Sequence, residues 1–346
     1  MGTALLTGFP GFIGRRLVRT LREEGHDVVA LVEPRMVETA RGLGVAGVEV
    51  VPGDIADRRL GLDDAGYDRL RSAVTHVFHL AAIYDLAVPA ELAQRVNVDG
   101  TGNVVDFCLH CERLERLAYV STAYVAGDRH GVVYEHELSL GQGFKNHYES
   151  TKFQAELWVR EEMRRLPTTI LRPAIVVGDS RTGETEKFDG PYYLLRTIAR
   201  SERLGRPVMQ FGKSAASFNV VPVDYVVAAI TRAAFLPEAA DQTLHLVDPD
   251  PLSAVELLRA LSQEYAGRAP KGRVPPAVVE QSLRSARVRE LFGGAPRESI
   301  AYLNHPVTFD TRRAVEVLGP HGLEPPNFTT YVGPMVRYFR ENEARR

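Results

Sequence analysis

A glycine-rich turn near the start of the chain constrains the fold more than any other feature of the sequence. The turn runs Gly8-Phe9-Pro10-Gly11-Phe12-Ile13-Gly14, between the apolar run Ala4-Leu5-Leu6 and apolar residues that recur at helical spacing. Glycines at this spacing allow a tight turn and let backbone N–H groups approach a pyrophosphate, whose charge a helix N-terminus favours. The sequence therefore predicts that residues 8 to 14 bind a dinucleotide.

Short apolar runs alternate with helical patterns through the first half of the chain. The runs predict strands near residues 4–6, 28–32, 48–51, 77–80, 118–120 and 168–171. Near-continuous apolar strands separated by helices are typical of a parallel sheet covered on both faces, and right-handed crossovers make such a sheet doubly wound. We therefore expect an α/β chain with a doubly wound parallel sheet, the Rossmann arrangement, and a smaller, mostly helical C-terminal substrate lobe.

The pattern changes after about Gly178, where a segment rich in Gly, Asp and Thr begins. We expect residues 1–178 to form the dinucleotide-binding domain. A strand near 218–220, a helix over 223–235 and a strand over 243–246 indicate that residues 217–249 return to the sheet. The remaining segments, 179–216 and 250–346, are then assigned to the substrate lobe.

Composition excludes several classes of protein. The 346 residues carry a formal net charge of -2, without the basic excess of an electrostatic nucleic-acid binder. No apolar stretch is long enough for a transmembrane segment, and the N-terminus lacks a basic leader, so we expect a cytoplasmic protein. Cys108 and Cys111 are the two cysteines, and with no second Cys or His pair at suitable spacing we expect no metal site.

Further cofactor contacts are expected where the next strands end. Asp54, in Gly53-Asp54-Ile55 after the third strand, can accept a hydrogen bond from an adenine amino group, although this sequence also fits an ordinary turn. Leu80, Ala81 and Ala82 come at the end of the fourth strand, and the small side chains of Ala81 and Ala82 allow the backbone to approach a cofactor.

The end of the second strand decides between NAD and NADP. A carboxylate there binds the adenine ribose hydroxyls, whereas an arginine accommodates the 2′-phosphate. The sequence Val32-Glu33-Pro34-Arg35 offers both, because Glu33 favours NAD and Arg35 can reach a phosphate. Both cofactors stay open at this point.

The candidate catalytic groups are a Tyr-x-x-x-Lys pair and the hydroxyls after the fifth strand. Tyr148 and Lys152 lie four residues apart at the start of an amphipathic helix, so they share one face. An ammonium beside a phenol is expected to lower the phenol's pKa and to make Tyr148 a general acid or base. Ser121 and Thr122 follow the fifth strand, where a hydroxyl points into the ligand crevice and can polarise a carbonyl oxygen.

Together these stretches resemble the extended short-chain dehydrogenases over nearly the whole chain. The resemblance also covers Asn97-Val98-Asp99-Gly100-Thr101 and Arg172-Pro173-Ala174-Ile175-Val176-Val177-Gly178. It implies that Thr122 is the hydroxyl donor, Tyr148 the acid, and Lys152 its partner and the ligand of the nicotinamide ribose. It further implies that Asn97 supports the active site, and that Pro173 and residues after it, including Ile175, line the nicotinamide.

Within that superfamily the chain is most similar to the male-sterility branch of fatty acyl-CoA reductases and thioester reductase domains. Ser121-Thr122-Ala123-Tyr124-Val125 and Gly178-Asp179-Ser180-Arg181-Thr182-Gly183 carry this likeness. The branch usually has Arg where this chain has Glu33, so the preference for NADPH is not implied.

The resemblance implies a small-molecule substrate, and a homodimer is common in this fold. Our main hypothesis is NAD(P)H-dependent reduction of a ketone, aldehyde or acyl thioester with an apolar tail. The alternatives are an NAD-dependent sugar-nucleotide epimerase, which reuses the same tyrosine, and a non-catalytic dinucleotide sensor. A dehydratase would need Asp-Glu where the chain has Ala123-Tyr124.

Overall fold

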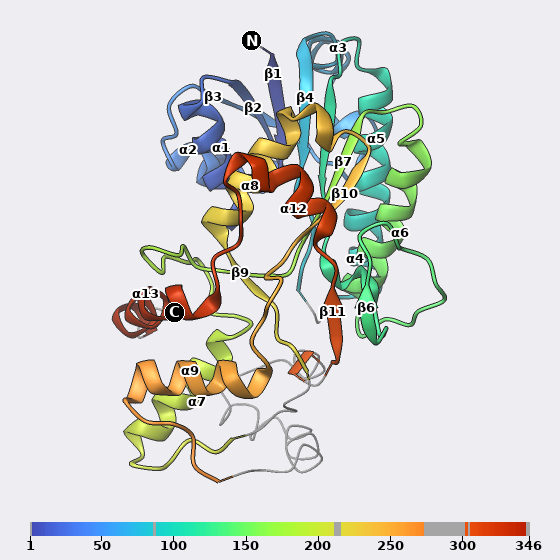
Figure 1. Ribbon diagram of the computed structural model, residues 1–346. Helices are drawn as coiled ribbons and strands as arrows, with labels where there is room; N and C mark the ends of the chain where they lie inside the picture. The colour runs from blue at the N-terminus through green and yellow to red at the C-terminus, as the bar shows by residue number, and fades with distance from the viewer. Residues whose placement is uncertain (1, 86–87, 211–215, 273–301, 304, 344–346) are drawn as a thin grey trace.

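A parallel sheet of seven strands forms the centre of the described part of the chain (Figure 1). The computed structural model describes residues 2–85, 88–210, 216–272, 302–303 and 305–343. The strands run in the order β10-β7-β5-β4-β1-β2-β3, and each neighbouring pair is parallel. Their bounds are β1 (Thr3–Thr7), β2 (Asp27–Val32), β3 (Val48–Pro52), β4 (Val74–His79), β5 (Arg116–Val120), β7 (Thr168–Pro173) and β10 (Gln242–Leu246).

Helices cover both faces of this sheet, so the predicted doubly wound α/β fold is confirmed. One face packs against α1 (Phe12–Glu23), α8 (Val223–Phe235) and α12 (Arg312–Leu318), and the other against α3 (Asp64–Ala73), α5 (Gly100–His110) and α6 (His147–Glu162). Successive strand residues alternate between two apolar clusters, since Leu6 and Ala118 face the first layer and Leu5 and Tyr119 the second. A sheet buried on both faces requires the continuous apolar runs of the sequence.

The remaining elements are short or belong to the second half of the chain. The helices are α2 (Val37–Gly42), α4 (Ala90–Ala93), α7 (Tyr192–Arg203), α9 (Ala254–Ala266) and α13 (Phe328–Asn342). The short strands are β6 (Gly131–Val133), β8 (Ile175–Val177), β9 (Val220–Pro222) and β11 (Val307–Phe309). The short helical turns are η1 (Pro34–Met36), η2 (Arg58–Gly61), η3 (Gln94–Asp99), η4 (Ala123–Ala126), η5 (Pro237–Ala239) and η7 (Gly319–His321).

A mostly helical lobe lies beyond one end of the sheet, as the sequence predicts (Figure 1). Its helices α7, α9 and α13 pack against one another. Helix α9 begins with reciprocal capping, in which Ser253 Oγ accepts from Glu256 N at 3.2 Å and the Glu256 carboxylate accepts from Ser253 N at 2.9 Å. None of the described helices is both long and apolar enough to cross a membrane.

The strand expected near residues 218–220 does not join the central sheet. Helix α8 packs on the central sheet and β10 is an edge strand of it. Strand β9, in contrast, pairs with β8 in a separate two-stranded sheet. The Asn219 side chain explains this path, because it exchanges hydrogen bonds of 2.7 and 2.9 Å with the backbone of Asp248, beyond the end of β10. The prediction that this strand returns to the sheet is therefore wrong.

Part of the C-terminal segment packs against the sheet domain. Strand β11 pairs with β6, and α12 lies against β10. The buried Glu135 carboxylate fixes this contact, because it accepts hydrogen bonds from Arg313 N at 2.6 Å and Ala314 N at 3.0 Å at the start of α12. Residues 307–318 thus lie outside the helical lobe to which the sequence assigns them, and residues 273–301 lie outside the described part of the chain.

The glycine turn requires glycine at two positions for reasons of space and backbone geometry. Gly8 adopts a φ of 94°, which side-chain-bearing residues rarely adopt. A Cβ atom on Gly14 would lie 2.4 Å from the Gly8 carbonyl oxygen, so the turn and helix α1 can meet this closely only without a side chain.

We predict that Gly14→Ala lowers the free energy of unfolding by about 2 kcal/mol, because the added methyl group must displace backbone. The matched control is Gly102→Ala on α5, where a Cβ atom meets nothing within 4 Å. Replacing a helical glycine there is expected to raise stability by up to about 1 kcal/mol. Urea denaturation of both variants measures the difference, and equal effects would contradict the account of the turn.

Candidate functional site

The strands β5, β4 and β1 are neighbours in the sheet, and the residues that follow their carboxyl ends include most of the predicted site. The glycine turn follows β1, Leu80-Ala81-Ala82 follows β4, and Ser121-Thr122 follows β5. Thr7 Oγ1 accepts a hydrogen bond from Ala81 N at 3.2 Å, which ties the first two strand ends together. His79 lies below this contact, with its ring nitrogens 2.7 Å from Thr7 Oγ1 and 3.0 Å from Thr101 Oγ1.

The turn of residues 8–14 has the geometry of an anion cradle. Gly11 N donates to Gly8 O at 3.0 Å, and the first bond of α1 runs from Arg15 N to Gly11 O at 2.9 Å. The amides of Phe12, Ile13 and Gly14 therefore lie in the first helical turn, where N–H groups have no acceptor within the helix. Backbone donors and the absence of Cβ atoms fit a diphosphate at this position.

Glu33 and Arg35 form an ion pair with each other at the end of β2. Arg35 Nε lies 2.6 Å from Glu33 Oε1, and the two side chains are 75% and 41% exposed, respectively. The two groups that distinguish NAD from NADP are thus adjacent and accessible, and each neutralises the other.

The Gly53-Asp54-Ile55 turn is held in place by several contacts. Asp54 Oδ1 accepts from Ala56 N at 2.9 Å, and Asn103 Nδ2 donates to Ile55 O at 2.8 Å. The Ile55 side chain is buried against Gly100 of α5. The adenine contact of Asp54 stays a prediction, since this carboxylate already closes a local turn.

Thr122 and Tyr148 come together from β5 and α6. Helix α6 is capped by Asn146, whose Oδ1 accepts from Glu149 N at 2.9 Å, and Tyr148 lies in its first turn. The Thr122 hydroxyl lies near enough to the Tyr148 phenol to lower its pKa. Thr122 Oγ1 also donates weakly to Pro173 O at 3.5 Å, which brings the end of β7 to the same point.

Lys152 lies one turn further along α6 and is almost fully buried. Its Nζ donates to Val120 O at 2.9 Å and lies 4.4 Å from the centroid of the Tyr119 ring. Burial lowers the pKa of the Lys152 ammonium to about 7, against the opposing charge of Glu156. Lys152 is therefore fixed at the end of β5 and titrates near neutral pH.

The expected lowering of the Tyr148 pKa is wrong for this structure. Burial raises the pKa of Tyr148 to about 12, and although the hydrogen bond with Thr122 lowers it, the charges of Glu149 and Tyr84 raise it further. The physical reason is that desolvation disfavours the phenolate, while the Lys152 ammonium is directed at the Val120 carbonyl and the Tyr119 ring. Tyr148 therefore holds its proton at neutral pH.

The two remaining candidates of the catalytic set have different positions. Asn97 is fully buried and bridges the loop after β4 to α6, with Ile83 N donating to its Oδ1 at 2.8 Å and its Nδ2 donating to Thr151 Oγ1 at 3.0 Å. The structure thus places Asn97 where it can support the site. The hydroxyl of Ser121 is buried and donates to Glu156 Oε2 at 2.6 Å.

Two residues are expected to line the nicotinamide. The Pro173 carbonyl accepts the hydrogen bond from Thr122, at the site. Ile175 lies in β8, and its N–H donates to Asn219 O at 3.3 Å.

Residues that the sequence did not indicate also surround Tyr148. Tyr84 follows β4, and the Lys187 ammonium lies 4.5 Å from the centroid of its ring. Next to Tyr148, the buried carboxylate of Glu149 accepts from Tyr302 Oη at 2.6 Å and from Lys145 Nζ at 3.2 Å. Tyr84 and Lys187 lie in irregular segments and Tyr302 in a short helical turn, none with a periodic pattern, so only the Gly- and Asp-rich composition around Lys187 marked its segment in the sequence.

A known family matches the part of the chain that contains these residues. A model of an NAD-binding family described as male sterility protein matches residues 6–230, which include the glycine turn, Thr122, Tyr148 and Lys152. The chain is 27% identical to the carboxylic acid reductase of Segniliparus rugosus, over 66% of this chain and 22% of that protein. It is 29% identical to the L-2-aminoadipate reductase large subunit of Penicillium chrysogenum, over 68% of this chain and 19% of that protein.

The chain thus spans about a fifth of the length of these two relatives. Among solved structures it is similar to the terminal R domain from the myxalamid PKS-NRPS biosynthetic pathway. The TM-score is 0.83 and the identity 26%, over 99% of this chain and 91% of that one. The central sheet and the helical lobe therefore have a counterpart in this solved R domain.

We predict that His79 makes the protein sensitive to acid. Burial and the Lys152 charge lower the pKa of His79 from 6.5 to about 3, so between these values the unfolded chain binds a proton that the folded chain does not. The free energy of unfolding should therefore fall as the pH falls below 6.5. From pH 6.5 to 5 this histidine accounts for about 2 kcal/mol of the loss.

The measurement is urea denaturation at both pH values for the parent and His79→Gln, whose acid-induced loss should be smaller. His110→Gln is the matched control, because His110 is exposed on α5. Identical losses in parent and His79→Gln would contradict the prediction.

Proposed function

Since the chain belongs to the family of male sterility proteins, we propose that it is an NAD(P)H-dependent reductase of a carbonyl group. Its substrate is a ketone, aldehyde or acyl thioester with an apolar tail. The observation that carries this proposal is that Thr122 lies near the Tyr148 phenol and Lys152 is bound to Val120, all at the carboxyl end of β5, on the side of the sheet where the glycine turn follows β1.

The glycine turn would hold the diphosphate of the dinucleotide, which supplies hydride when bound. Tyr148 then donates its proton to the carbonyl oxygen as negative charge develops there, and the Thr122 hydroxyl stabilises that charge by a hydrogen bond. A Tyr148 pKa near 12 suits proton transfer from Tyr148 to the substrate, because the phenol is fully protonated at neutral pH and an alkoxide is a stronger base than a phenolate. Lys152 would contact the nicotinamide ribose and keep positive charge close to the reacting oxygen.

The named relatives support reduction rather than epimerisation. Carboxylic acid reductase and L-2-aminoadipate reductase are reductases by name, and the match to each covers about two thirds of this chain. Sugar-nucleotide epimerisation would use the same tyrosine, and a dinucleotide sensor would need no acid at all. The three groups at the sheet edge favour an enzyme over a sensor. Dehydration lacks its acid and base, because η4 has buried Ala123 and Tyr124 at those positions.

The finer assignments are part of the same proposal. Residues 179–216 and the helical part of 250–346 would form the wall that takes the substrate tail, since Lys187 already reaches Tyr84 at the site. We also propose a homodimer in the cytoplasm, which size-exclusion chromatography with light scattering and cell fractionation would test.

We predict that Tyr148→Phe lowers kcat/KM for carbonyl reduction by about 100-fold or more, because the reacting oxygen loses its proton donor. Oxidation of the reduced cofactor, followed by absorbance with a long-chain aldehyde and an acyl thioester as substrates, measures this loss. Cofactor affinity should change by less than about threefold, since no charge is removed.

Tyr134→Phe serves as the matched control, because Tyr134 directly follows β6 and its ring centroid lies 5.7 Å from that of His136. A Tyr148→Phe variant as active as this control would overturn the mechanism.

We predict opposite effects of Glu33→Ala and Arg35→Ala on cofactor preference. Removing Glu33 frees the Arg35 guanidinium for a 2′-phosphate, so the ratio of NADPH to NADH affinity should rise by about 3- to 10-fold. Removing Arg35 frees the carboxylate for ribose hydroxyls and repels a phosphate, so the ratio should fall. Fluorescence titrations with both cofactors measure the ratios. Changes in the same direction would show that this ion pair does not face the ribose.

A further inference from the structure

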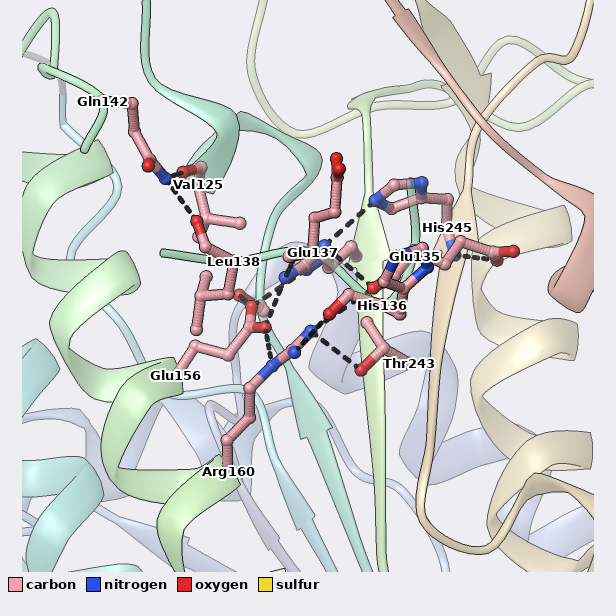
Figure 2. A network of polar contacts seen from close by, with 12 residues as sticks. Val125, Glu135, His136, Glu137, Leu138, Gln142, Glu156, Arg160, Thr243 and His245 are labelled. Carbon is pink, nitrogen blue, oxygen red and sulfur yellow. Dashed lines mark hydrogen bonds and ion pairs between the residues drawn. The ribbon is translucent and has the colours of Figure 1, made fainter. Parts of the chain in front are cut away.

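A buried network of charged side chains contacts Ser121, the residue that follows β5. Its centre is the ion pair of Glu156 and Arg172, whose side chains are both 0% exposed and are joined by hydrogen bonds of 2.6 and 3.0 Å. Arg160 Nε donates to the same carboxylate at 3.0 Å. Figure 2 shows Glu156 and Arg160 projecting from α6 towards Glu135, Thr243 and His245.

Stability alone does not explain such a network. The free energy lost when two charges leave water commonly exceeds the free energy gained from their attraction. Well-packed apolar side chains of similar volume often stabilise a fold equally well. What the network provides is a carboxylate of fixed charge in a fixed place. The pKa of Glu156 is lowered although burial opposes this, because Arg172, Arg160 and the Ser121 hydroxyl all stabilise the ionised form.

That carboxylate is connected to the reacting groups by two short ties. Glu156 follows Lys152 by one turn on α6 and accepts from Ser121 Oγ at 2.6 Å. Ser121 stands between Val120, whose carbonyl accepts from Lys152 Nζ at 2.9 Å, and Thr122. Two hydrogen bonds thus hold helix α6 against the end of β5, at the two residues that precede Thr122.

Glu156 also supplies the negative charge that acts on Lys152. The other titratable groups that contact or act on the ammonium are His79 on β4 and Tyr119 on β5. Burial leaves His79 neutral, with a pKa of about 3, and raises the pKa of the Tyr119 phenol. Burial lowers the pKa of Lys152 to about 7, and the charge of Glu156 opposes that fall.

We propose that Glu156 is a positioning residue, which orients the Ser121-Thr122 strand end and supplies the charge that keeps Lys152 in its ammonium form. The benefit to catalysis rests on the proposed function, whereas the effect on Lys152 does not. The test therefore measures the ionisation of Lys152 directly, without turnover.

The lysine content makes this measurement simple. Lysine occurs only at positions 145, 152, 187, 213 and 271, so a protein labelled with ¹³C at lysine Cε gives few resonances. The resonance lost in Lys152→Arg identifies Lys152. Its titration midpoint in the parent should be close to neutral, and in Glu156→Gln it should fall by about one pH unit, since the guanidinium groups of Arg172 and Arg160 are left without their carboxylate. Glu156→Asp, which keeps the charge, should restore the midpoint towards that of the parent.

Two further variants separate charge from structure. Glu161→Gln makes the same chemical change at an exposed position of α6 and should leave the midpoint unchanged. Arg160→Gln removes a cation beside Glu156 and should raise the midpoint, the opposite sign. Because the Arg160 side chain is 23% exposed, this variant tests the proposal even where Glu156→Gln does not fold.

A midpoint that does not respond to Glu156→Gln, or that moves in the same direction in Glu156→Gln and Arg160→Gln, would overturn the proposal. If Glu156→Gln yields no folded protein, an unchanged or lowered midpoint in Arg160→Gln overturns it instead. A protein without reductase activity whose Lys152 midpoint moves as expected would refute the proposed function and leave the role of Glu156 standing. In an active enzyme, the pH profile of kcat should shift in parallel with the midpoint.

Discussion

The attachment of helix α6 to the end of β5 is the constraint on which the rest of the site depends. Lys152 Nζ is bound to the Val120 carbonyl, and Ser121 Oγ is bound to Glu156, so strand end and helix are held together by two buried contacts. Thr122 follows this strand end, and its hydroxyl lies near enough to the Tyr148 phenol of α6 to lower the pKa of that phenol. The same end of the sheet carries the glycine turn, where we propose that the dinucleotide binds.

Burial sets the protonation states on which the proposed chemistry relies. It raises the pKa of Tyr148 to about 12 and lowers the pKa of Lys152 to about 7, because each charged form loses hydration. The phenol is therefore a proton donor at neutral pH, while the ammonium needs support from a neighbouring carboxylate. That division of roles suits reduction, in which the developing alkoxide must receive a proton.

The sequence predicted the elements whose pattern is local and missed those that depend on distant partners. Apolar runs and the glycine spacing identified the strands of the central sheet and the first turn. The sequence could not show that Asn219 would bind the Asp248 backbone and divert β9, because these residues meet only in the folded chain. For the same reason the sequence indicates Ser121 as a substrate ligand, although in the structure its hydroxyl donates to Glu156. Nor does the sequence show that burial raises the pKa of Tyr148.

Transfer of isotope from the cofactor tests the central claim most directly. The protein would be supplied with reduced nicotinamide cofactor carrying deuterium at C4 on either face, together with an apolar-tailed aldehyde or acyl thioester, and the product analysed by mass spectrometry. The account predicts deuterium on the former carbonyl carbon of the product with one of the two labelled faces. Product that forms without deuterium from either face would contradict direct hydride transfer at this site.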